Sequence, residues 1–80
     1  MKWFNIWFEY TKAIIETMIR NMNDDLENGY DPKGLCIQYQ REQIAERQGE
    51  MDSQLDQFKE MSDARVNSWC FYDLKKRGVI

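Results

Sequence analysis

The chain is divided by one short segment, Asn28-Gly29-Tyr30-Asp31-Pro32-Lys33-Gly34, which contains two of the four glycines and the only proline of the 80-residue sequence. Glycine and proline interrupt helices and favour turns. On both sides of this segment the hydrophobic residues recur at helical spacing. The segment therefore predicts a turn at about residues 29–34 between two long helices.

The segment before the turn carries a wide hydrophobic face. On a helical wheel its apolar side chains fall within an arc of about 140°, and they are Phe4, Trp7, Phe8, Ile14, Ile15, Met18, Ile19, Met22 and Leu26. Charged and polar side chains fill the opposite side. The spacing predicts an amphipathic helix from about Lys2 to Asn28. Gly29 suits the left-handed C-cap that glycine adopts without steric cost.

The segment after the turn carries a narrower hydrophobic stripe, within about 80° on a single wheel. Its members are Ile37, Ile44, Met51, Leu55, Phe58, Val66 and Trp69. Asp31 and Pro32 suit the N-cap and the first position of a helix. We therefore expect a second helix from about Pro32 to at least Met61, and the stripe keeps its phase far enough for the helix to continue to Lys76. Ser62 is also a suitable N-cap, so the alternative is a break near Ser62 and a third helix that folds back.

These patterns predict one all-α domain spanning residues 1–80. It is an antiparallel helical hairpin with a long second helix, or a three-helix bundle if that helix breaks near Ser62. In the unbroken hairpin about twenty C-terminal residues overhang the first helix, including exposed aromatic side chains. We therefore expect a homodimer built as a bundle of two hairpins. Its expected interface residues are Trp3, Trp7, Ile14, Trp69 and Phe71.

The composition argues against catalytic and cofactor chemistry. There is no histidine, which is the commonest general base and the commonest zinc ligand. Cys36 and Cys70 are too far apart in sequence for a paired-cysteine motif, and Glu42, Glu46 and Glu50 lie opposite the apolar stripe. We expect no enzymatic activity, no metal and no cofactor. No stretch resembles a signal peptide or a membrane span, so we expect a cytoplasmic protein with reduced thiols.

Charge is distributed unevenly along the chain, whose net charge is −3. Residues 24–63 hold eleven acidic and four basic side chains, whereas residues 64–80 hold four basic and one acidic. An acidic middle disfavours a duplex-binding role. The acids of the second helix and the C-terminal aromatic residues are the candidate contacts for a protein partner: Glu42, Glu46, Asp52, Asp56, Glu60, Asp63, Trp69, Phe71 and Tyr72.

The principal hypothesis is a small acidic helical interaction module that binds or occludes a partner protein. Viruses and mobile elements often encode chains of this size and charge as inhibitors of a host protein, here one that binds nucleic acid. The alternative is a dimeric nucleic-acid-associated regulator that uses a basic C-terminus of Arg65, Lys75, Lys76 and Arg77. The third hypothesis is a peripheral membrane element anchored by Trp3, Phe4, Trp7 and Phe8.

Overall fold

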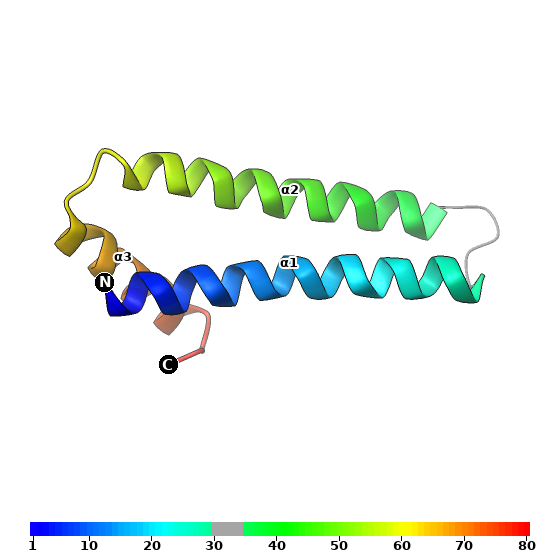
Figure 1. The fold of residues 1–80 in the computed structure, drawn as a ribbon, viewed down its shortest axis with the longest axis horizontal. Coiled ribbons are helices and arrows are strands. Elements are labelled where there is room, and N and C mark those ends of the chain that lie inside the picture. The colour runs from blue at the N-terminus through cyan, green and yellow to red at the C-terminus, as the bar shows by residue number, and fades with distance from the viewer. Residues whose placement is uncertain (30–34) are drawn as a thin grey trace.

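The computed structural model describes residues 1–29 and 35–80 and places them in three helices, α1 (Lys2–Asn28), α2 (Leu35–Phe58) and α3 (Asp63–Lys76). Helices α1 and α2 lie side by side and antiparallel, and α3 folds back across the N-terminal half of α1 (Figure 1). The N-terminus and the C-terminus therefore lie at the same end of the hairpin. The all-α class predicted from the sequence is confirmed.

Helix α1 ends where a glycine permits the chain to leave the helix. Gly29 has a φ of 65° and a ψ of 28°, and its backbone N–H donates to the carbonyl oxygen of Asp25. An L-residue with a side chain is strained in this left-handed conformation, whereas glycine is not. Near the same end, the Gln40 side chain of α2 donates from Nε2 to Asp25 Oδ2 over 2.9 Å. The expected helix start at Asp31 and Pro32, the turn residues 30–34 and the side chain of Cys36 lie outside the described residues.

The expectation of an unbroken second helix is wrong, because α2 ends at Phe58 and α3 begins at Asp63. The break falls at Ser62, which has a φ of −67° and a ψ of 155°. Its hydroxyl oxygen accepts a hydrogen bond from the backbone N–H of Arg65 over 3.4 Å. Ser62 is therefore the N-cap of a separate helix, and the fold-back given as the alternative is the arrangement that forms.

The core lies at the end of the hairpin where all three helices meet. Its buried residues are Trp7, Phe58, Val66, Cys70 and Leu74. The Trp7 ring packs edge-to-face on the rings of Phe58 at 5.2 Å and Trp69 at 5.8 Å, measured between ring centroids. The hydrophobic face of α1 is too wide for one helix to cover. Helix α2 covers one side of this face and α3 covers the other, which is why the chain turns back at Ser62.

The molecule is elongated, with principal extents of 48 × 24 × 17 Å and a radius of gyration of 15.5 Å. A compact chain of this length has a radius of gyration of about 12 Å. The accessible surface is 5954 Å², against about 5,100 Å² for a compact chain of this mass. The excess arises because α3 covers only one end of the hairpin (Figure 1). None of the three described helices has the length and apolarity required to cross a bilayer.

Candidate protein-binding face

The third helix is fixed to the first by a hydrogen-bonded cap that joins distant parts of the sequence. Asn67 Oδ1 accepts from the backbone N–H groups of Trp3, over 2.8 Å, and Phe4, over 3.4 Å. Met1, at the N-cap position of α1, makes no side-chain cap of its own. Helix α3 therefore supplies the acceptor that the first turn of α1 lacks. Sequence reasoning missed Asn67, and the only signal was the absence of a capping residue before Lys2.

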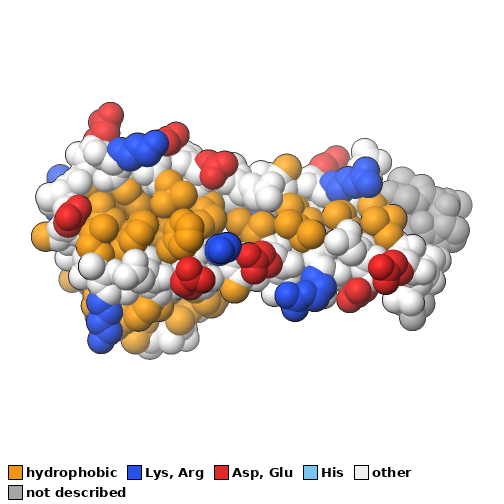
Figure 2. All heavy atoms as spheres, in the orientation of Figure 1, with side chains coloured by type: hydrophobic (Ala, Val, Ile, Leu, Met, Phe, Trp, Pro, Cys, Tyr) orange, Lys and Arg blue, Asp and Glu red, His pale blue; other side chains and the backbone are white. Residues whose placement is uncertain are grey.

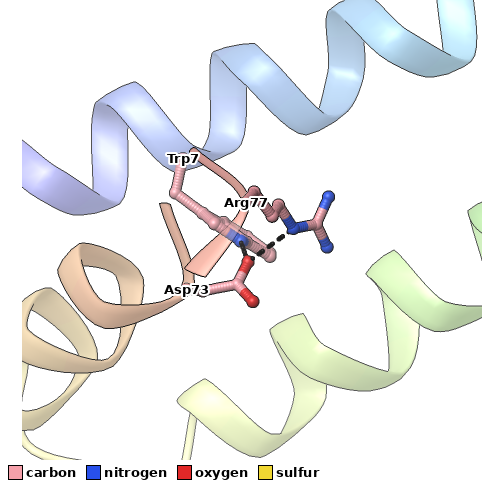
Figure 3. Close-up of polar contacts among 3 residues, drawn as sticks. All are labelled: Trp7, Asp73 and Arg77. Atoms are coloured by element: carbon pink, nitrogen blue, oxygen red, sulfur yellow. Dashed lines mark hydrogen bonds and ion pairs between the residues drawn. The ribbon is translucent and has the colours of Figure 1, made fainter. Parts of the chain in front are cut away.

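A second polar contact fixes the other end of α3. Trp7 Nε1 donates to Asp73 Oδ2 over 2.9 Å, and Arg77 Nε donates to the same oxygen over 3.0 Å (Figure 3). The Asp73 side chain is 18% exposed, so the contact is largely shielded from water. Arg77, a candidate nucleic-acid contact, is thereby paired within the chain. Lys75, Lys76 and Arg65 are exposed.

A groove lies along the junction of α1 and α2 and is lined by residues from both helices. We call it the seam groove; its volume is about 500 Å³ and its lining residues are Lys12, Ile15, Glu16, Ile19, Gln48, Met51 and Asp52. A smaller hollow of about 260 Å³ lies toward α3 and also has Ile15 and Met51 among its lining residues. These two side chains therefore sit at the contact between the helices. Figure 2 shows hydrophobic side chains in a band between α1 and α2, with charged side chains on both sides of it.

The six acids expected to contact a partner are all exposed but do not form one cluster. Glu42, Glu46, Asp52 and Asp56 lie on α2, Glu60 lies in the connection, and Asp63 is the first residue of α3. Only Asp52 of this set lines the seam groove. The groove also receives Glu16, whose Oε1 lies 4.0 Å from Lys12 Nζ. Acidic charge thus occupies both helices at the edge of the groove.

Most of the aromatic residues singled out from the sequence pack against one another within the chain. Trp3 contacts Phe71 with ring centroids 5.0 Å apart, and Trp69 contacts both Trp7 and Phe58. Tyr72 differs, because it is 67% exposed. Of the expected dimer-interface residues, Trp3, Trp7, Trp69 and Phe71 therefore have partners in their own chain, and Ile14 lines the smaller hollow. Phe4 and Phe8, which with Trp3 and Trp7 were the membrane-anchor candidates, also pack against the core.

The Cys70 thiol is free and completely buried between helices. Burial raises its pKa to about 11, and the negative charge of Asp73 adds to the effect. The reactive thiolate is therefore scarce at neutral pH. Within residues 1–29 and 35–80, no three His, Cys, Asp or Glu side chains form a group that could hold a metal ion.

No family model, curated protein or solved structure matches this chain.

Proposed function

We propose that this chain is a non-enzymatic interaction module that binds a partner protein through the seam groove and the acidic side chains beside it. The observation that carries the proposal is the apolar band between α1 and α2, in which Ile19 and Met51 are half-buried at the groove (Figure 2). Soluble monomers rarely leave a continuous apolar surface without a partner. The groove lies at the two-helix part of the molecule, and two of its lining side chains, Ile15 and Ile19, come from the wide apolar face of α1.

The fold itself indicates what kind of partner fits. At the other end of the hairpin, α3 lies across α1 and completes a three-helix core. An amphipathic helix from a partner can complete the seam groove in the same way, with its apolar side chains against the half-buried Ile19 and Met51, while Ile15 forms the buried floor. The groove also holds Lys12, which pairs with Glu16, so its net charge is −1 and Asp52 is the acid that favours a basic residue beside that apolar stripe. A basic protein, such as one that binds nucleic acid, has this chemistry, and the bound module would occlude its surface.

A matched pair of variants tests the proposal. Ile19→Glu places a charge in the seam groove, whereas Thr17→Glu places the same charge on the exposed side of the same helix. Proteins captured by the wild-type chain from an extract of its source organism are identified, purified and titrated against each form by calorimetry. We expect Ile19→Glu to weaken binding at least about tenfold, as expected for a charge forced into an apolar contact, and Thr17→Glu to bind as the wild type does.

The same titrations at low and moderate salt test the charge contribution. Binding should weaken as salt screens Asp52. The proposal is wrong if the captured protein binds Ile19→Glu as tightly as the wild type, or if nothing specific is captured at either salt concentration. Fluorescence polarisation with DNA and RNA at about 50 mM salt tests the nucleic-acid alternative, because electrostatic binding is strongest at low salt.

A further inference from the structure

The connection between α2 and α3 is a turn that keeps hydrogen bonds of helical sense as far as Met61. The backbone N–H groups of Lys59, Glu60 and Met61 donate to the carbonyls three residues earlier, at 3.1–3.3 Å. Val66 N donates to Ser62 O over 3.0 Å and begins α3. Ser62 has a φ of −67°, which is helical, and a ψ of 155°, which is extended. The ψ of Ser62 therefore departs from the helical value directly before α3 begins.

The residues of this connection do not oppose a straight helix. Residues 59–62 are Lys, Glu, Met and Ser, with neither glycine nor proline, and all four are tolerated in helices. If the helix continued through Ser62, the buried residues of α2 and those of α3 would together span about 160° around it, with mean directions about 90° apart. A continuous helix would thus keep its apolar surfaces on one side.

The polar contacts that hold α3 in place are made to α1. Asn67 caps Trp3 and Phe4, and Asp73 binds Trp7 Nε1. Asn67, near the start of α3, contacts Trp3, near the start of α1. Arg77, directly after α3, lines the same hollow as Ile14, further along α1. Helix α3 therefore runs in the same general direction as α1. The identical site exists on α1 of a second copy.

We propose that α3 exchanges between two copies of the chain, with Ser62 as the hinge. In the exchanged dimer α2 and α3 form one helix that passes beyond the N-terminal end of its own α1. A second hairpin can be placed end to end with the first about a two-fold axis. The α1 of the second hairpin then lies beside the α3 of the first and runs in the same direction as that α3. Each Asn67 then caps the α1 of the other chain, and the native contacts are kept in both copies. The dimer leaves the seam groove open, so this proposal is independent of the proposed function.

Two substitutions at the hinge push the equilibrium in opposite directions. Asp63→Pro suits the folded-back chain, because proline is favoured at the first helical position and the residue before it prefers the extended ψ that Ser62 has. The same proline disrupts a continuous helix. Ser62→Ala removes the cap of the folded-back form and favours the straight helix. It should raise the dimerisation constant about 25-fold, a factor of about five for the lost N-cap of each of the two chains.

Each form is refolded at high protein concentration and sized by light scattering after gel filtration. We expect a dimer for the wild type, more dimer for Ser62→Ala, and monomer with an undiminished melting temperature for Asp63→Pro. In a mixed dimer of isotope-labelled and unlabelled chains, filtered nuclear Overhauser contacts between the Trp3 and Phe71 rings should join different chains. The proposal is overturned if Asp63→Pro dimerises as the wild type does, if the wild type and Ser62→Ala both stay monomeric, or if the Trp3–Phe71 contacts stay within one chain.

Discussion

At the scale of single residues, Asp73 is the acceptor on which the packing of the largest buried side chain depends. Trp7 is 2% exposed, and its indole N–H has Asp73 Oδ2 as its partner. A buried donor without a partner costs about 1–3 kcal/mol. We expect Asp73→Ala to lower the free energy of unfolding by that amount, measured by urea denaturation. Asp73→Asn retains an acceptor oxygen and should lose less. Equal losses for the two variants would contradict this assignment.

Cys70 makes stability depend on alkaline pH. Burial raises its pKa from 9.0 to about 11, so between these values the unfolded chain releases a proton that the folded chain keeps. The contribution of the protonated Cys70 thiol to the free energy of unfolding is therefore intact below about pH 9. It is lost as the pH rises toward 11, by at most about 1.4 kcal/mol per pH unit. Denaturant titrations across this range should show a shallower fall in stability for Cys70→Ala than for the wild type. Parallel curves would refute the prediction.

At the scale of the elements, Asn67 joins the beginning of α1 to α3. Loss of an N-cap acceptor costs about 1 kcal/mol, so Asn67→Ala should lower the free energy of unfolding by about that amount. Asn67→Asp keeps the acceptor and adds a negative charge at the positive end of α1, and should be tolerated. Ser68→Ala, at an exposed neighbouring position of α3, is the control. If Asn67→Ala is no more destabilising than the control, the cap contributes nothing.

Gly49 lies in the middle of α2 and weakens it. A Cβ added there meets no atom within 4 Å, whereas Gly29 needs its φ of 65°. We therefore expect Gly49→Ala to raise the free energy of unfolding by about 1 kcal/mol. Gly29→Ala should lower it by about the same amount, because alanine is strained in the left-handed region. Thermal unfolding followed by circular dichroism should show melting temperatures that move in opposite directions. If the melting temperatures of both variants moved in the same direction, the assignment of Gly49 to an open helical position would be contradicted.

At the scale of the whole molecule, the sequence predicts the helices better than their arrangement. Local signals identified α1, because its apolar face is unbroken and Gly29 ends it. The choice at Ser62 could not be made locally, because the apolar stripe continues in phase through a residue that is equally suited to capping a new helix. The width of the apolar face of α1 favours the break at Ser62, because this face needs two covering helices. From the sequence, either a second chain or a folded-back third helix could provide that second cover, and in the structure α3 provides it.

The candidate site was predictable only in part, for the same reason. The exposed acids of α2 could be listed from the wheel, but the wheel does not show that Asp52 alone among them reaches the seam groove. Trp69 and Phe71 were expected at a dimer interface, with packing against Trp3 and Trp7 of the same chain as the alternative if the second helix broke. Their partners, Trp7 and Trp3, are more than sixty residues away in the sequence.

The cap that joins Asn67 to Trp3 also sets the order of events during synthesis. On the ribosome, the aromatic face of α1 emerges before α3, and the acceptor for its first turn, Asn67, is made 64 residues after Trp3. Helix α2 can cover part of this face through Phe58, but a nascent chain lacks the cover of Trp69 and Phe71 until α3 has left the exit tunnel, and in that interval its apolar surface is exposed to aggregation. Proteolysis of stalled nascent chains should show protection of α1 only after Leu74 has emerged. Protection before that point would mean that α2 alone shields the face.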